Sequence, residues 1–264
     1  TITDANGCIK TKTITITSPL SLVANGSSTN VNCFGNCNGT ACVAPTGGNT
    51  PYTYSWSNGA STSCITGLCA PLSLTCTVTD SKTCTATYIT TIAQSVALTV
   101  TVTGTNLLCN GGCIGTATAV AAGGSGSYTY LLVPGGYTTS SVTGLCAANY
   151  SLTVTDAIGC TATASVAITE PSVFTGTIIK NNVTCNGLCD GWATALPIGG
   201  TSPYTYLWSN GGTTQTITGL CAATYSIIGT DANGCTKTGT VTITQPLPLT
   251  VTPSKTDIVC SGFC

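Results

Sequence analysis

The residues of this sequence whose type and spacing could do chemistry are its cysteines. There are 18 of them among 264 residues, and the chain has no histidine. Most fall into four series that recur every 75 to 77 residues. The series are Cys33, Cys109, Cys185 and Cys260; Cys37, Cys113, Cys189 and Cys264; Cys69, Cys146 and Cys221; and Cys8, Cys84, Cys160 and Cys235. Thiols in such numbers either bind zinc or form disulfide bonds.

We favour disulfide bonds over an all-thiolate zinc site, because such cysteine density is typical of proteins from oxidising compartments. Four cysteines in one unit allow three pairings. We predict that the first pairs with the fourth and the second with the third. The first of these bonds would tie the start of a unit to its last hairpin. The predicted bridges are Cys33–Cys84 with Cys37–Cys69, Cys109–Cys160 with Cys113–Cys146, and Cys185–Cys235 with Cys189–Cys221.

The remaining cysteines have separate predictions. Cys42 and Cys64 stand where the other units have Thr or Ser, so we expect them to face outward and to pair with each other. Cys76 stands where the other units have Leu and Ile, which predicts a buried thiol. Three cysteines near the ends of the sequence are predicted to bond with repeats outside it: Cys8, Cys260 and Cys264.

The rest of the composition argues against catalysis and against charged partners. The chain has 6 Lys, 7 acidic residues, no Met and a net charge of −1. It lacks the commonest general base, and no nucleophile, base and acid recur together, so we expect no enzyme activity and no cofactor. Nucleic acid requires a basic face, and a membrane-spanning helix requires about 20 apolar residues in a row; the sequence offers neither.

A single aspartate precedes the fourth cysteine of each unit. Calcium sites use several oxygen ligands, usually with more than one carboxylate. We therefore predict an Asx turn at each aspartate and no metal site. The residues are Asp80, Asp156 and Asp231.

The elements that position these cysteines are arranged in tandem units. The phrase Pro-Tyr-Thr-Tyr-x-Trp-Ser-Asn-Gly occurs at residues 51–59 and again at 203–211. The units are repeat 1 (residues 19–94), repeat 2 (95–170) and repeat 3 (171–245). We expect residues 1–18 to be the C-terminal part of a preceding repeat and residues 246–264 to be the N-terminal part of a following one.

Within each unit the pattern is typical of β-strands. Thr11–Thr17, Ala97–Thr103 and Ser151–Thr155 alternate apolar and polar residues, and pairs such as Asn233-Gly234 predict tight turns. The sequence predicts an all-β chain of tandem immunoglobulin-like β-sandwich repeats of about 76 residues. Linkers of almost no length, stiffened by proline, predict that the repeats form a rod.

The tryptophans have two readings. Trp56 and Trp208 follow two tyrosines on one face of a strand, and Leu132 replaces them in repeat 2. This substitution favours a position in the sandwich core, whereas exposed rings would indicate a sugar-binding platform. Trp192 occupies a slot that Thr fills in the other units, and we predict that it faces outward as a surface contact.

Several phrases together resemble the SprB repeat. The clearest match runs from Cys185 to Pro246 and includes Thr-Ser-Pro-Tyr-Thr-Tyr-x-Trp-Ser-Asn-Gly and Asp-Ala-Asn-Gly-Cys. The resemblance implies a module of giant cell-surface adhesins of gliding bacteria, exported by the type IX secretion system. Modules of that family usually carry the first and fourth cysteines. The second and third, such as Cys189 and Cys221, then look like a supplementary pair, which supports the pairing predicted above.

We therefore expect a secreted structural protein at the cell surface. It would be a filament or adhesin stalk that spaces an adhesive tip from the cell or bundles with itself. The alternative is a carbohydrate-binding repeat that grips polysaccharide through Tyr and Trp faces. The expected partners are neighbouring repeats of the same polypeptide, laterally associated copies, and a surface or polysaccharide ligand.

Overall fold

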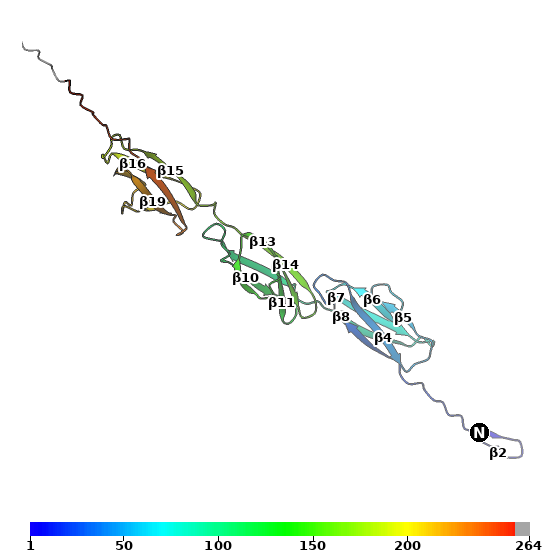
Figure 1. Cartoon of the computed structure of the whole chain (residues 1–264). Helices are drawn as coiled ribbons and strands as arrows, with labels where there is room; N and C mark the ends of the chain where they lie inside the picture. Colours follow the sequence, from blue (N-terminus) through cyan, green and yellow to red (C-terminus); the bar gives the residue numbers. More distant parts are fainter. Residues whose placement is uncertain (257–264) are drawn as a thin grey trace, which may run out of the picture. The chain divides into compact units, whose positions relative to one another are not determined.

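The computed structural model describes residues 1–256, which form strands, turns and loops and contain no helix (Figure 1). Repeat 1 contributes β3 (Val23–Thr29), β4 (Gly39–Thr46), β5 (Thr53–Trp56), β6 (Cys64–Leu68), β7 (Leu72–Thr79) and β8 (Thr85–Ile92). Repeat 2 contributes β9 (Thr99–Thr105), β10 (Gly115–Ala122), β11 (Tyr128–Val133), β12 (Ser141–Leu145), β13 (Ala148–Asp156) and β14 (Thr161–Ile168). Repeat 3 contributes β15 (Thr175–Asn181), β16 (Gly191–Ile198), β17 (Thr205–Trp208), β18 (Thr216–Leu220), β19 (Ala223–Thr230) and β20 (Thr236–Ile243).

Each repeat folds as two three-stranded sheets. In repeat 1 the strand orders are β3-β4-β6 and β5-β7-β8, and the same orders recur in the other two repeats. The strand pairs are antiparallel, as between β7 and β8 and between β19 and β20. Alternating Thr and apolar residues suit such half-buried strands. The all-β, immunoglobulin-like sandwich predicted from the sequence is confirmed.

Tryptophan lies in the core of repeats 1 and 3. Trp56 is 2% exposed and Trp208 is 1% exposed, and each indole N–H donates a hydrogen bond to a backbone carbonyl, of Thr62 and Thr214 respectively. Both rings pack among the buried residues of their own sandwich. The sugar-binding reading of these two rings is therefore wrong, and the core reading is confirmed.

The N-terminal segment forms less strand than its pattern predicts. β1 (Ile2–Thr3) and β2 (Ile9–Lys10) make a two-stranded hairpin around Asp4. The alternating run Thr11–Thr17 forms no strand, so that prediction was wrong. Alternation specifies a strand only where a neighbouring strand pairs with its backbone groups, and β1 pairs with only two residues of β2.

The two ends of a sandwich hold different parts of the repeat. In repeat 1 the chain enters at Val23 and runs along β3 to the loop that contains Cys33. That loop lies beside the end of β8, because the Val31 N–H donates to the carbonyl of Ala93. The turn that contains Cys84 joins the other end of β8 to β7. Cys33 and Cys84 therefore lie at opposite ends, separated by the eight residues of β8, or about 26 Å.

The described chain divides into two compact units. One comprises residues 1–101, 120–132 and 152–164, and the other comprises residues 102–119, 133–151 and 165 onwards. The cut passes through repeat 2, so the repeat boundaries drawn from the sequence stay a prediction.

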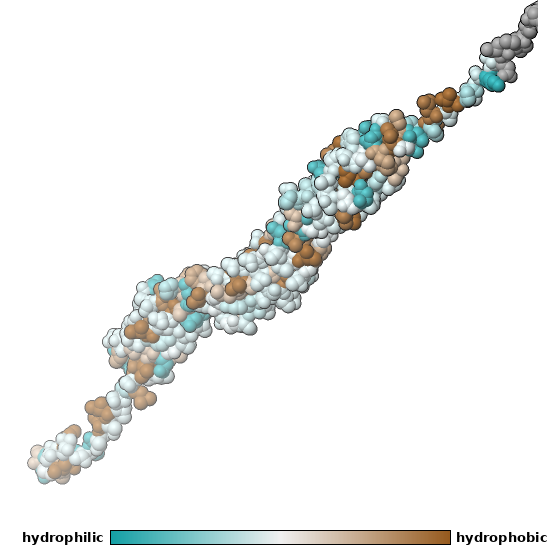
Figure 2. All heavy atoms as spheres, turned by 90° about the vertical axis from the view of Figure 1, so that its left-hand side faces the viewer, coloured by the Kyte–Doolittle hydropathy of each residue, from teal (hydrophilic) through white to brown (hydrophobic). Residues whose placement is uncertain are grey.

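The face of the molecule in Figure 2 has neither a strongly hydrophilic nor a continuous apolar region. Figure 2 shows mostly residues of intermediate hydropathy, with hydrophobic and hydrophilic side chains scattered among them. This appearance agrees with a sequence in which only 5% of the residues are charged. Within residues 1–256 we find no helix of the length and apolar character needed to cross a membrane.

Candidate functional site

Six disulfide bonds are present among residues 1–256. Four of them lie within a single repeat and have the predicted partners: Cys37–Cys69, Cys113–Cys146, Cys189–Cys221 and Cys42–Cys64. Strand pairing explains the last one, because Cys42 on β4 is directly opposite Cys64 on β6. Cys76 is 0% exposed in the core of repeat 1, and burial raises the pKa of its thiol above the ordinary value, against a smaller opposing effect of a hydrogen bond with the Ser55 backbone.

The predicted bonds between first and fourth cysteines of one repeat are wrong. Cys33 of repeat 1 bonds to Cys160 of repeat 2, and Cys109 of repeat 2 bonds to Cys235 of repeat 3. The predicted pairs Cys33–Cys84, Cys109–Cys160 and Cys185–Cys235 are absent, and Cys84 and Cys185 are exposed free thiols. In repeats 1 and 2 the first cysteine thus bonds to the fourth cysteine of the next repeat.

The fold gives the physical reason for this correction. A disulfide requires Cα atoms within about 7 Å of each other. Cys33 and Cys84 lie at opposite ends of one sandwich, well beyond that distance. Cys33 instead lies at the end where repeat 1 continues into repeat 2, and its Cα is 5.6 Å from that of Cys160.

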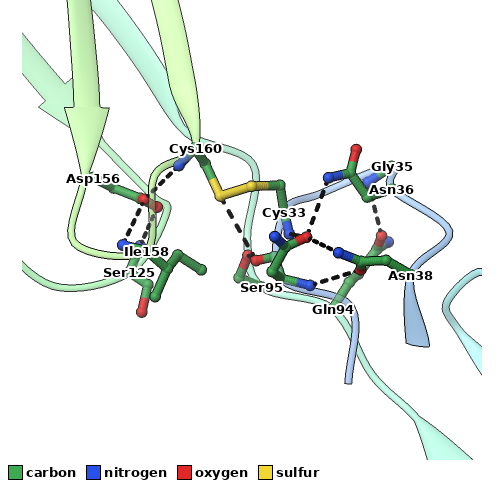
Figure 3. The surroundings of a disulfide bond; sticks show 11 residues. Cys33, Gly35, Asn36, Asn38, Gln94, Ser95, Ser125, Asp156, Ile158 and Cys160 are labelled. Carbon is green, nitrogen blue, oxygen red and sulfur yellow. Dashed lines mark hydrogen bonds between the residues drawn. A yellow bond between two sulfur atoms is a disulfide. The ribbon is translucent and has the colours of Figure 1, made fainter. Parts of the chain in front are cut away.

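The turn before the fourth cysteine is held by an aspartate (Figure 3). Oδ1 of Asp156 accepts hydrogen bonds from the backbone N–H groups of Ile158 and Cys160, at 3.1 and 2.8 Å. Its Oδ2 accepts from the N–H of Ser125 at 2.9 Å. Gly124 has a φ of +64°, and a Cβ at this position would lie only 2.7 Å from Oδ2, so the close approach requires glycine.

The same arrangement recurs at every fourth cysteine, and the Asx turns predicted at these aspartates are present. Asp80 and Asp231 accept corresponding hydrogen bonds from Cys84 and Cys235, and Asp4 accepts from Cys8. Asp80, Asp156 and Asp231 are 5 to 6% exposed. Burial alone would raise the pKa of each carboxyl, but the backbone hydrogen bonds outweigh burial and hold the pKa below its ordinary value.

The loop around Cys33 is held by asparagine side chains. Oδ1 of Asn32 accepts hydrogen bonds from the backbone N–H of Cys33 and from the side-chain amides of Asn36 and Asn38. Gly35 donates its backbone N–H to the side chain of Gln94, at the end of repeat 1. Figure 3 shows this network around Cys33 on one side of the disulfide and the Asp156 turn around Cys160 on the other.

We call each disulfide between consecutive repeats, together with the loops that carry its cysteines, a joint. The first joint contains Cys33–Cys160 and the second contains Cys109–Cys235, and the surroundings of the two bonds differ. Asn233, which follows Asp231 by two residues, donates its side-chain amide to the carbonyl of Leu108 and to Oγ1 of Thr201. Ile158 takes its place at the first joint and cannot make these bonds. A polar cleft of about 400 Å³ lies beside the first disulfide, lined by Cys33, Phe34, Asn36, Ala97, Leu98, Gly159, Cys160 and Thr161.

The other predicted site residues lie away from the joints or outside the described chain. Trp192 is half-buried on β16, where it alternates with buried Ala193 and is paired in register with Asn181 and Thr218. Cys8 is an exposed free thiol. Cys260 and Cys264 fall outside the described residues.

The sequence contained a signal for the joints that the pairing argument missed. A strand-like run separates each unit's N-terminal boundary from its first cysteine, and another separates the fourth cysteine from the C-terminal boundary. If the chain crosses the sandwich, the first cysteine must lie near the following repeat and the fourth near the preceding one. Periodicity alone could not show this. It assigns each cysteine to one of the four series, but it does not say whether its partner lies in the same repeat or in a neighbouring one.

Comparison with solved structures finds matches at low similarity. A structure concerned with host cell surface retention of a 1.5-MDa bacterial ice-binding adhesin aligns at a TM-score of 0.39 and 14% identity, covering 86% of this chain and 99% of that one. The N-terminal eight Ig domains of Down Syndrome Cell Adhesion Molecule align at 0.31 and 11%, covering 80% of this chain and 34% of that one. Extracellular domains 3–5 of Drosophila OTK align at 0.29 and 12%, covering 85% and 93%.

The present chain therefore spans about a third of the eight-domain structure that it matches. Among curated proteins, none matches this sequence.

The family comparison gives the clearest result. The model of the SprB repeat matches three times, at residues 25–61, 101–136 and 177–213. Each match begins in the first strand of a repeat and includes its first and second cysteines. The chain thus carries three matches to the SprB repeat, one in each sandwich.

Proposed function

We propose that this chain is a load-bearing part of an extracellular structural protein, a surface filament or adhesin stalk that spaces an adhesive tip from the cell. The observation that carries the proposal is the covalent bond between consecutive repeats, Cys33–Cys160 and Cys109–Cys235. A bond of this kind adds nothing to an isolated sandwich, but it fastens one module to the next. The SprB-repeat family and the cysteine density support a secreted, disulfide-permissive location.

The free cysteines suggest how the arrangement continues. Cys8 and Cys84 belong to the series of Cys160, and Cys185 belongs to the series of Cys33. We propose that they form the same kind of bond with further repeats of the same polypeptide, and that Cys260 and Cys264 also serve such repeats. The loop around Cys185 has the same support as the loop around the bonded Cys33, because Gly187 donates its backbone N–H to the side chain of Gln245 as Gly35 does to that of Gln94.

Cell-surface exposure tests the proposed location and role. Antibodies against residues 19–245 should label intact cells of the source organism, and protease added to those cells should abolish the label without lysis. Non-reducing peptide mapping of the released material should recover the Cys33–Cys160 linkage. Label that appears only after lysis would contradict a surface stalk.

Lateral self-association is proposed to involve Trp192. The ring lies half-buried on the outer face of β16, where the other repeats have Thr40 and Thr116. Trp192→Thr gives repeat 3 the residue of its neighbours and should lower any self-association measured by sedimentation. Thr116→Ser serves as the matched control, and equal sedimentation of all three chains would contradict a contact at Trp192.

A further inference from the structure

The bonds between repeats overlap along the chain. Cys33–Cys160 and Cys109–Cys235 span 127 and 126 residues, and the segment from 109 to 160 lies within both spans. A third bond, Cys113–Cys146, lies inside that shared segment. Most of the polypeptide between Cys33 and Cys235 therefore lies off the shortest covalent route between them.

Counting residues along that route shows how large the effect is. Along the backbone, Cys33 and Cys235 are 202 residues apart. The shorter route crosses the first bond from Cys33 to Cys160 and runs fourteen residues back along the backbone to Cys146. It then crosses the second bond to Cys113, runs four residues back to Cys109, and crosses the third bond to Cys235. The shortest route therefore contains 18 residues.

We infer that these overlapping disulfides form a mechanical bypass that limits how far a pulling force can separate Cys33 from Cys235. A polypeptide under tension reaches about 3.5 Å per residue, so the 18-residue route and its bridges become taut at roughly 80 Å. The 202 residues of the reduced chain would reach roughly 700 Å on the same scale. Sandwiches on the bypassed segments can lose their fold without lengthening the distance between Cys33 and Cys235 beyond the shorter limit.

The bonds within single repeats cannot produce this limit by themselves. With Cys37–Cys69, Cys113–Cys146 and Cys189–Cys221 alone, the shortest route from Cys33 to Cys235 contains 105 residues, or roughly 380 Å with its bridges. The limit on extension therefore depends on the two bonds between repeats, and this dependence gives the inference a direct test.

The test is force–extension measurement on the oxidised full chain, tethered by its two termini after its exposed thiols have been alkylated. The unmodified chain should become taut roughly 300 Å shorter than a variant that lacks both joints, Cys33→Ser with Cys160→Ser and Cys109→Ser with Cys235→Ser. Removing only Cys113 and Cys146 (both →Ser) should lengthen the chain by roughly 80 Å, because the shortest route then crosses Cys33–Cys160 and Cys189–Cys221 and contains 43 residues.

The matched control removes Cys42–Cys64 (both →Ser). This bond lies inside the segment closed by Cys37–Cys69, off the shortest route, and its loss should leave the taut length unchanged. Because the taut length depends on covalent connectivity, a variant that folds poorly still gives a valid reading. Equal lengths for the unmodified chain and the joint-free variant would overturn the bypass.

The inference deepens the proposed function, and the two can fail separately. A short taut length in a chain that is absent from the cell surface would keep the bypass and remove the surface stalk. Surface labelling of a chain whose length does not depend on its joint cysteines would do the reverse.

Discussion

Repeats 1 and 3 build the same sandwich from different side chains. In repeat 1 the first strand carries Gly26, and a Cβ there would lie 2.5 Å from the ring of Tyr88 on the last strand. In repeat 3 the equivalent positions are Ile178 and Gly239, so the large and small residues have exchanged strands. A Cβ on Gly239 would lie 3.1 Å from Cδ1 of Ile178. The comparison shows that this part of the core requires a total volume and not a particular residue.

The joints differ between the same two repeats in another respect. Cys33 of repeat 1 is bonded to repeat 2, whereas the equivalent Cys185 of repeat 3 is a free thiol. The loop around Cys185 keeps its internal support, because Asn186 donates to the carbonyl of Pro246. The loop therefore has its own structure, and the bond is an addition to it.

The largest expected effect concerns this difference. Cys33→Ser with Cys160→Ser removes a bond whose closed loop lowers the entropy of the unfolded chain, and should cost about 4 kcal/mol of unfolding free energy. Cys185→Ser removes a thiol that has no partner in this structure and should leave the free energy unchanged. Thermal unfolding of the two variants measures both effects, and equal melting temperatures would contradict the bonding pattern.

The exchange of core residues is the next test. Tyr88→Gly leaves repeat 1 with glycine on both strands and should cost about 3 kcal/mol through the cavity. Gly239→Tyr places a ring against Ile178 in repeat 3 and should cost about 1–3 kcal/mol through overpacking. Adding Ile178→Gly to the second variant should recover much of that loss. Denaturant unfolding measures this coupling, and strictly additive costs would show that the two positions are independent.

These positions also show how far the sequence could predict the structure. Alternation and turn residues were sufficient for the sandwich, since each strand needs only its own pattern and a neighbour. The second and third cysteines were paired correctly because both lie in one repeat at adjacent strand ends. The first and fourth were not, because the partner of Cys33 lies 127 residues away in another repeat. The replacement of Gly26 in repeat 1 by Ile178 in repeat 3 can be interpreted only once the facing residue on the last strand is known.

Acid should weaken repeats 1 and 3 to a similar degree, although only one of their turn cysteines is bonded. The pKa values of Asp80 and Asp231 lie below the ordinary value in the folded state. Their contribution to stability is therefore complete above the unfolded pKa, about 3.9, and is lost as the pH falls below it through the folded pKa. Melting temperature should fall below about pH 4, and hydrogen exchange should show the loss in both repeats. Loss confined to one repeat would mean that bonding of the neighbouring cysteine controls the turn.

The smallest expected effect concerns a single methyl group in repeat 3. Gly239 has no unusual backbone conformation, and Ala164 occupies the equivalent position in repeat 2. An added Cβ would lie 3.1 Å from Cδ1 of Ile178 and 3.3 Å from Cγ2 of Ile227, both side-chain atoms, beside an apolar groove of about 50 Å³. Gly239→Ala should therefore stabilise the repeat by about 0.5 kcal/mol, because alanine restricts the unfolded chain more than glycine does.

Two controls separate this gain from a general preference for alanine in strands. Gly26→Ala meets the Tyr88 ring at 2.5 Å, and Gly176→Ala meets the carbonyl oxygen of Leu196 at 2.7 Å. Both should destabilise, the second because a backbone atom has less freedom to move. Denaturant midpoints of the three variants rank them directly. Stabilisation by all three would mean that unfolded-state entropy dominates, and destabilisation by Gly239→Ala would mean that Ile178 and Ile227 cannot yield by a few tenths of an ångström.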